Sequence, residues 1–348
     1  MRITNKMVTS KYIRSLNTLS TDLDKLNTQV ASGRAFSKSS ESTSAAVKAF
    51  QIRRDMSKTE GYQGNIDHAQ SSLTNTESAL SHIEELMQEA KDKILIGKTG
   101  TCSDDERKIV AKQLRSIQDQ LLQALNSNAS GVYYFGGTNT DTKPFTVVGG
   151  KLNYNGYPLD KPLPAGTAAD NDALIKILKN DAMYVDIGLG ASVVPIDPVD
   201  PNSKTIVDPS TVFKYTVPGI NVVGSGSITL SNGDEVPNNL YDLLGKIANG
   251  LETNYSFAIT DELYGKFSEA SMGIVYNLTE VGSKTSYLDF ITDRYDTQTL
   301  DMQKQQVSVE GADPAKTIIK FKTQEVAYNA ALQMGTKIIQ PSIFDFMS

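Results

Sequence analysis

Residues 66–94 read IDHAQSSLTNTESALSHIEELMQEAKDKI, and this stretch decides the fold. Apolar or small residues recur in it at alternating steps of three and four. They are Ile66, Ala69, Leu73, Thr76, Leu80, Ile83, Met87, Ala90 and Ile94. Such spacing turns one stripe of a helix toward a partner helix along its whole length. At about 1.5 Å per residue the stretch would span roughly 40 Å, so the pattern predicts a long helix of a rod and not a globule.

The same spacing recurs in other parts of the chain. A first stripe consists of Tyr12, Leu16, Leu19, Leu23, Leu26 and Val30. A second follows a Ser103–Glu106 capping box and consists of Val110, Leu114, Ile117, Leu121 and Ala124. A third runs from Tyr264 to Met302. A last helix is predicted to begin at Asp313-Pro314, a good N-cap followed by proline in the first turn, and to end before Pro341.

Proline separates these helical flanks from the middle of the chain. No proline precedes Pro144, ten of the twelve lie from Pro144 to Pro237, and two follow. Proline breaks helices and central strands. Residues 145–262 also carry seven Lys and Arg against fourteen Asp and Glu, whereas residues 1–50 carry eight against three. The middle is therefore predicted to be an acidic, turn-rich insertion between helical arms.

Short strands and tight turns are predicted inside the insertion. Residues 211–217 alternate in polarity, and residues 227–231 lead into Asn232-Gly233, a strong hairpin signal. Asn155-Gly156 is a second candidate turn. Short helices are expected at 173–178 and 240–251. The fold class that follows is mainly α with an inserted β-rich domain.

The composition excludes several classes of function. A net charge of −6 and a pI near 5.1 provide no basic field for nucleic acid. No apolar run approaches the ~18 residues of a membrane span, and the N-terminus lacks the apolar core of a cleaved signal peptide. The single Cys102 cannot form an internal disulfide. By themselves these features would suggest a cytoplasmic protein.

Residue types that often carry chemistry are present but do not assemble into a site. His68 and His82 lie on one predicted helix without clustered carboxylates, so neither indicates a metal site. Asp104, Asp105 and Glu106 fall in a first helical turn, where acids complement the helix dipole. Gly131–Gly137 has no lysine that would accompany a phosphate loop. We therefore expect no catalytic residues, no metal and no cofactor.

Several segments resemble the bacterial flagellin superfamily. The opening MRIT runs into a long helix and then into QVASGR at 29–34, which is similar to the helix break of that family. The ending IFDF at 343–346 and the segment GVYYFGGTNTDTKPF at 131–145 are similar to the branch of the superfamily that joins the flagellar hook to the filament. The resemblance covers about 1–145 and 263–348.

The resemblance implies a structural protein of the hook–filament junction that is not an enzyme. It implies a flagellin-like antiparallel rod, divided into a terminal coiled-coil region (1–60 with 306–348), a helical rod (61–144 with 263–305) and an outward-facing insertion (145–262). It also implies an extracellular location, reached through the flagellar export apparatus without a cleaved signal, which replaces the cytoplasmic reading. Implied partners are further copies of the chain, a neighbouring hook-associated protein, flagellin and an export chaperone at the C-terminal arm, with no nucleic acid and no membrane.

Pairing of the two chain ends is the expected basis of assembly. The candidate interface comprises Tyr12, Leu16, Leu19, Leu23, Leu26, Val30, Val326, Leu332, Ile338, Ile339, Ile343 and Phe344. The N-terminal stripe is expected to face apolar positions such as Val326, Leu332 and Ile339. Because a lone amphipathic helix is marginal in water, we expect both arms to order fully only when neighbouring subunits cover them.

Two alternatives stay open at this stage. Within the structural class, the chain could be the flagellin subunit of the filament itself. From another class, the insertion could carry an enzyme or an adhesive module. A metal- or substrate-binding cluster within 145–262 would favour that second alternative, and the sequence of the insertion contains no such cluster.

Overall fold

Long helices dominate the computed structural model, which describes residues 5–160, 181–195, 205–253 and 255–338. The chain forms two compact units, and each is described by itself. The terminal unit comprises residues 1–60 and 295–348, and the central unit comprises residues 61–294. Two of the helices run through the boundary and contribute to both units.

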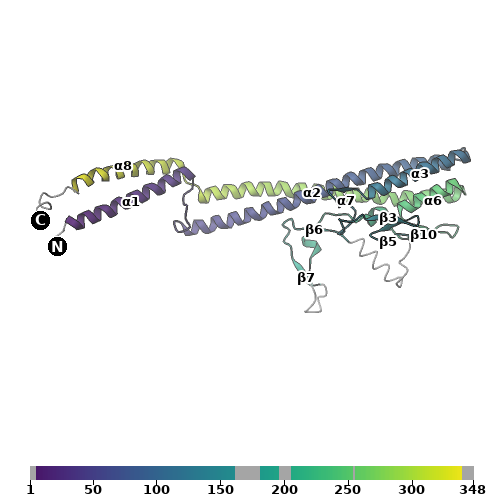
Figure 1. Cartoon of the computed structure of the whole chain (residues 1–348), viewed down its shortest axis with the longest axis horizontal. Helices are drawn as coiled ribbons and strands as arrows, with labels where there is room; N and C mark the ends of the chain where they lie inside the picture. The colour runs from purple at the N-terminus through teal and green to yellow at the C-terminus, as the bar shows by residue number, and fades with distance from the viewer. Residues whose placement is uncertain (1–4, 161–180, 196–204, 254, 339–348) are drawn as a thin grey trace. The chain divides into compact units, whose positions relative to one another are not determined.

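Six long helices lie in the described part of the chain (Figure 1). They are α1 (Asn5–Ser32), α2 (Thr43–Lys98), α3 (Asp104–Leu125), α6 (Leu240–Glu252), α7 (Phe257–Glu310) and α8 (Pro314–Ile338). A short helix, α5, spans Gly219–Val223. The predicted helices of both arms and the expected helix at 240–251 are thus confirmed. The candidate helix at 173–178 lies outside the described residues.

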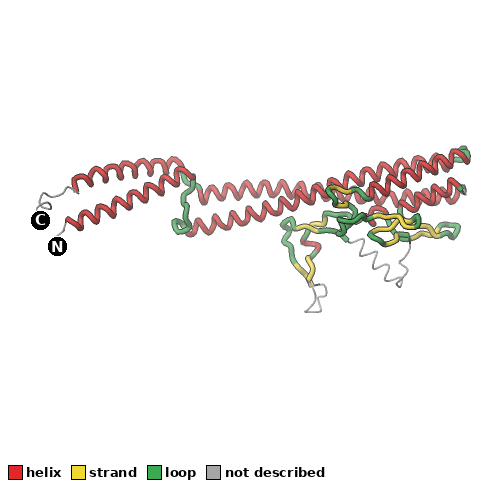
Figure 2. The backbone as a smooth tube through the Cα atoms, in the orientation of Figure 1, coloured by secondary structure: helices red, strands yellow, loops and turns green. Residues whose placement is uncertain are grey.

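Every described sheet is small and antiparallel (Figure 2). A three-stranded sheet contains β3 (Phe145–Val148), β4 (Lys151–Tyr154) and β5 (Tyr157–Pro158). The two-stranded pairs are β1 (Asn128–Ala129) with β2 (Val132–Tyr133), β6 (Tyr184–Val185) with β9 (Phe213–Lys214), β7 (Val193–Pro195) with β8 (Thr205–Val207), and β10 (Ser227–Thr229) with β11 (Glu235–Pro237). The predicted class, mainly α with an inserted β-rich domain, is confirmed.

The apolar stripe of residues 66–94 forms the core of the helical part of the central unit. All nine of its positions are buried. The facing stripe of α7 buries Phe267, Ile274, Val281 and Leu288. The two helices run antiparallel, because Gln70 donates to Asp289 at 2.5 Å and Lys98 pairs with Asp261 at 2.5 Å further along. The stripe predicted from the sequence is therefore the helix–helix seam.

Helix α6 packs against α3 and so extends this helical core. The amide of Gln118 donates to the carbonyl of Tyr241 at 2.8 Å, and Arg115 pairs with Glu252 at 2.7 Å. Gly245 permits the close approach, since a Cβ there would lie 2.8 Å from the Gln118 amide nitrogen. Part of the segment between the arms is thus helical and belongs to the bundle.

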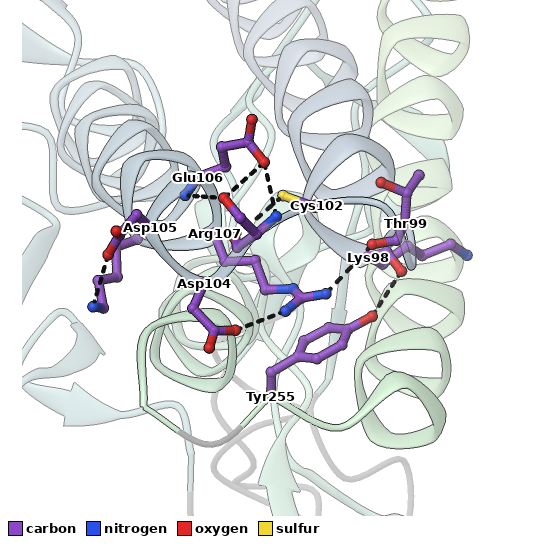
Figure 3. A network of polar contacts seen from close by, with 10 residues as sticks. Lys98, Thr99, Cys102, Asp104, Asp105, Glu106, Arg107 and Tyr255 are labelled. Atoms are coloured by element: carbon purple, nitrogen blue, oxygen red, sulfur yellow. Dashed lines mark hydrogen bonds and ion pairs between the residues drawn. The ribbon is translucent and has the colours of Figure 1, made fainter.

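A polar network closes the tip where α2 turns into α3 (Figure 3). The Ser103 hydroxyl accepts from the backbone N–H of Glu106 at 3.3 Å, and the Ser103 N–H donates to the Glu106 carboxylate at 2.7 Å, which confirms the predicted capping box. That backbone bond from Ser103 lowers the pKa of Glu106. Arg107 stacks 3.8 Å above the ring of Tyr255, whose hydroxyl donates to the Lys98 carbonyl at 2.7 Å. The network ties the α2–α3 turn to the segment that leads into α7.

The segment GVYYFGGTNTDTKPF leads into the β-rich insertion, and its two phenylalanines are part of the core there. Phe135 and Phe145 are fully buried, and the Phe145 ring lies 5.1 Å from the ring of Tyr154. The Asn126 side chain donates to the Phe145 carbonyl and accepts from its N–H, both at 3.0 Å. Gly219 packs against the same ring, because a Cβ there would lie 2.5 Å from Phe145. These contacts give the aromatic residues of the segment a structural role.

The insertion also packs against α2 and α7 within the central unit. The ring of Phe213 stacks on Tyr287 of α7 at 5.9 Å, and the ring of Tyr215 meets His68 of α2 edge-on at 5.8 Å. Asn65 donates to the carbonyl of Asp186 at 2.7 Å. His68 is thus a packing residue between a helix and the insertion.

The turn predictions for the insertion are confirmed, but one strand prediction is only partly correct. Asn155-Gly156 joins β4 to β5 with both φ angles positive, and Gly233 adopts φ +88° between β10 and β11. Of residues 211–217, only Phe213–Lys214 form a strand. Asp208 caps a 3-10 turn over Pro209–Thr211, and Pro218 has no N–H for a ladder, so the strand is cut short on both sides.

Candidate assembly interface

The terminal helices α1 and α8 pack side by side as an antiparallel pair (Figure 1). The predicted stripe of α1 faces α8, and five of its residues are half-buried: Tyr12, Leu16, Leu19, Leu23 and Leu26. Val30, at the end of the stripe, is mostly outside the seam and 41% exposed. Two helices cover each other on one side only, so no leucine of this seam reaches full burial.

The face of α8 that meets α1 differs from the expected one. Val326 and Leu332 are 68% and 43% exposed, so the expectation that they face the N-terminal stripe is wrong. The seam positions follow steps of four and three and are small, polar or aromatic. They are Thr317, Phe321, Gln324, Tyr328, Ala331 and Gly335. Ile338 is the last residue of α8, whereas Ile339, Ile343 and Phe344 lie outside the described residues.

Close approach at the far end of the pair explains why small residues occupy the last two positions of this seam. The Tyr12 hydroxyl donates to the carbonyl of Ala331 at 2.9 Å. A Cβ on Gly335 would lie 2.1 Å from the Tyr12 oxygen, so only glycine leaves room for this phenol. Larger branched residues at Ala331 or Gly335 would push the helices apart, and α8 therefore turns its isoleucine, valine and leucine side chains elsewhere.

Large apolar side chains remain exposed on the outside of the terminal unit. Helix α8 exposes Ile318, Ile319, Val326, Leu332 and Met334, and the other helices of the unit expose Met7, Ile13, Val47, Phe50, Leu300 and Val307. Single exposed apolar residues are ordinary, but a helix that has one face covered and still exposes several large apolar side chains offers surface to a second partner. Helix α1 covers one face of α8, and the second face is left open.

The described residues contain no arrangement that indicates catalysis or metal binding. Nowhere in the described ranges do three or more His, Cys, Asp or Glu side chains gather as they would around a metal. Within those ranges, too, every helix is too short or too polar to span a membrane. Cys102 is partly exposed, and its sulfur lies 3.8 Å from the Ser103 carbonyl.

One open cavity of about 450 Å³ lies between α3, α6 and the β3–β4 turn. Two of its cationic residues already have partners, since Arg115 pairs with Glu252 and Lys151 pairs with the buried Asp160. The carboxylate of Asp242 lines the same cavity, and burial raises its pKa. The cavity therefore holds little excess positive charge for an anion.

Comparison with known proteins agrees with the resemblance seen in the sequence. Residues 3–140 match the family model described as the bacterial flagellin N-terminal helical region. The flagellar hook-associated protein 3 of Escherichia coli K12 is 28% identical over 152 residues, which are 43% of this chain and 48% of that protein. Its counterpart from Salmonella typhimurium LT2 is 30% identical over 146 residues, 42% and 46% of the two chains. The matched segment thus spans about half the length of these curated relatives.

Solved structures with the same fold cover more of the chain. A protein from Vibrio parahaemolyticus described as a flagellar hook-associated protein aligns with a TM-score of 0.57 at 17% identity, covering 78% of this chain and all of that one. FlgL from Xanthomonas campestris aligns with a TM-score of 0.53 at 13% identity, covering 74% and 99%. At such identities the likeness establishes the fold alone.

The matched segment makes the N-terminal part of the chain similar to flagellins, and the chain shares the fold of solved flagellar hook-associated proteins. The curated relatives that it resembles are flagellar hook-associated proteins 3 from two bacteria.

Proposed function

We propose that this protein is a structural subunit of the bacterial flagellum that forms the junction between hook and filament. The observation that carries the proposal is helix α8 on a flagellin-like fold, since one of its faces meets α1 while its large apolar side chains remain exposed outside that contact. The names of the curated relatives support the junction role in particular. The protein is inferred to act by assembling and not by catalysis.

The open face of α8 gives a physical reason for self-assembly. Burying an exposed isoleucine, valine or methionine side chain against a neighbour contributes about 1.5–3 kcal/mol. Several such residues per subunit, repeated around a ring of identical copies, can offset the loss of translational and rotational freedom. We infer that further copies of the chain cover this face in the assembled junction.

The residues of the candidate interface divide into two groups under this proposal. Tyr12, Leu16, Leu19, Leu23 and Leu26 hold the pair of helices together within one subunit. Val30, Val326 and Leu332 are exposed in the single chain and are assigned to contacts between subunits. Ile338, Ile339, Ile343 and Phe344 are assigned to the same contacts and to an export chaperone that binds the C-terminal arm before assembly.

The proposal also assigns roles to three parts of the chain. Residues 1–60 with 306–348 form the coiled-coil region, residues 61–144 with 263–305 form the rod, and residues 145–262 form the outward-facing insertion. The neighbours in the flagellum are a second hook-associated protein and flagellin, and the chain reaches its extracellular position through the flagellar export apparatus. The alternative that this chain is the filament flagellin itself is favoured by the description of the family that residues 3–140 match.

Electron microscopy of a deletion strain tests the junction role. We expect hooks without filaments, with flagellin monomers released into the medium, because flagellin would be exported but could not attach. Restoring the gene on a plasmid should restore filaments, which excludes effects on neighbouring genes. Filaments of normal length on the deletion strain would contradict the proposal. Hooks without any secreted flagellin would instead indicate that this chain is the flagellin.

The half-buried seam makes a further prediction about the free subunit. Because α1 and α8 cover each other on one side only, and ordering each residue costs roughly 1–2 kcal/mol, their amides should exchange rapidly in the purified monomer. Hydrogen exchange over 12–30 and 318–338 should be fast there and slow in the assembled junction. The fully buried seam at 66–94 serves as the internal control. Strong protection of both terminal segments in the monomer would show that they fold unaided.

A further inference from the structure

The two linkers that lead to the terminal helices are bonded to each other. Residue 33 follows the end of α1, and residue 311 follows the end of α7. Arg34 and Gly311 form an antiparallel bridge, in which Ala35 donates to the carbonyl of Glu310 at 2.7 Å and Ala312 donates to the carbonyl of Gly33 at 2.8 Å. We call residues 33–35 with 310–312 the clasp. It joins points that are nearly 280 residues apart in the sequence.

Glu310 connects the clasp to helix α2. Its carbonyl accepts the bond from Ala35, while its buried carboxylate is ion-paired with Arg53 of α2. A buried carboxylate without its partner strongly destabilises the folded state. The ion pair with Arg53 therefore holds Glu310 in place. Gly311 is required beside it, because a Cβ there would lie 2.4 Å from the Val307 carbonyl. Both linkers are thereby fixed to the adjoining ends of α2 and α7 within the terminal unit.

The alignment of α1 with α8 is the same at the clasp as at the far end of the helix pair. Tyr12 lies 22 residues before Arg34 in the sequence. Its two contacts on α8, Ala331 and Gly335, lie 20 and 24 residues after Gly311. The antiparallel alignment set by the bridge therefore continues unchanged along α1 and α8, over about 33 Å at 1.5 Å per residue.

The seam between these points does not by itself define the alignment strongly. Its α8 side contains Thr317, Gln324 and Ala331, and side chains of this kind can face a row of leucines in more than one register. A shift of one heptad would place Tyr12 opposite Tyr328 instead of Gly335, where the phenol has no room. Two features thus distinguish the observed register from a shifted one: the clasp at the root of the pair and the recess at Gly335.

We propose that the clasp is a register-setting device that fixes how α1 and α8 align, with Arg53 and Glu310 as its anchor. A fixed register presents the outer apolar residues of α8 at one height in every copy of the chain. The inference concerns the terminal unit of the isolated chain, so it can be tested without any flagellum and can fail or succeed independently of the junction role.

Disulfide trapping in the purified full-length chain, with Cys102→Ser throughout, measures the register. The matched pair is Leu19→Cys with Gln324→Cys. The shifted pair is Leu19→Cys with Thr317→Cys, one heptad closer to the start of α8, as in the register that would place Tyr12 opposite Tyr328. Trapping captures transient pairing as well as stable pairing. With the clasp intact, we expect the matched pair to cross-link about tenfold faster than the shifted one, because only the matched pair fits the anchored alignment.

Arg53→Met should reduce this preference to about threefold or less, since it leaves the Glu310 carboxylate without its partner. Arg54→Met is the matched control, because Arg54 is exposed and pairs only with the adjacent Asp55 among the described residues. Gly311→Ala, which disturbs the bridge directly, should act like Arg53→Met. Equal rates for the two cysteine pairs with the clasp intact would overturn the proposal. The proposal would also be overturned if the Arg53→Met and Gly311→Ala chains both kept the same preference for the matched cysteine pair as the Arg54→Met control.

Discussion

Replacing Leu19 and Leu23 together with aspartate is expected to abolish filament attachment while the central unit stays folded. Both leucines lie in the half-buried seam between α1 and α8. Each substitution removes apolar contact and places an unpaired charge at the seam, which costs roughly 1–3 kcal/mol per site. The two new charges are four residues apart on one helix face and also repel each other. The helix pair, and with it the surface offered to neighbouring subunits, should be lost.

The measurement is a motility assay combined with electron microscopy of the mutant cells. Asn17→Asp with Ser20→Asp is the matched control, because it adds the same charge to exposed positions of the same helix. Hydrogen exchange at 66–94 should be unchanged in both variants and reports that the central unit is intact. Normal motility of the Leu19→Asp, Leu23→Asp strain would exclude a role for this seam in assembly.

Phe145→Ala is expected to produce the largest loss of stability in the insertion. The ring is fully buried between Tyr154 and Gly219, and the backbone at the same residue is held by both atoms of the Asn126 amide. Removing a buried phenylalanine ring leaves a cavity and typically costs 3–5 kcal/mol, so we expect about that decrease in the free energy of opening. Native-state hydrogen exchange at β3 and β4 measures it.

Val148→Ala provides the comparison for Phe145→Ala, because Val148 lies on the same strand and is largely exposed. Its effect should stay within about 0.5 kcal/mol. Exchange at 66–94 should change little in either variant if the helical seam has its own core. An effect of Phe145→Ala below about 1 kcal/mol would show that the aromatic cluster does not determine the stability of the insertion.

The helices could be predicted closely because their signals are local and repeated. All nine positions of the stripe in 66–94 are buried, and the capping box at Ser103 and the N-cap at Asp313 are formed as expected. Asn-Gly turns likewise carry their own conformational preference, which is independent of the rest of the fold. For such elements, the residues that cause the local structure lie within a few positions of one another in the sequence.

The face of α8 could not be predicted by searching for its largest apolar residues. Ile318, Ile319 and Val326 are more hydrophobic than most residues of the seam. The face that meets α1 is nevertheless determined by the close approach of the two helices at Ala331 and Gly335. A signal did exist, since positions 317, 321, 324, 328, 331 and 335 keep the same alternation of four and three as the other stripes. It was obscured because small and polar residues occupy most of these positions.

The clasp lies beyond sequence reasoning for a different reason. The bridge between Arg34 and Gly311, and the ion pair of Arg53 with Glu310, join residues that are more than 250 positions apart. No local preference identifies such partners. The predicted break at Gly33 did mark the right place, because Gly33 adopts φ +68° and closes α1 by donating to the Gln29 carbonyl at 3.0 Å.

The central claim, that this chain joins hook to filament through its terminal helices, is tested most directly by imaging isolated hook–filament complexes. Cryo-electron microscopy with the chain labelled within the insertion would locate the protein along the flagellum. We predict label confined to a short zone between hook and filament, with density for paired terminal helices at the inner wall of that zone. Label distributed along the whole filament, or absent from the zone between hook and filament, would contradict the account.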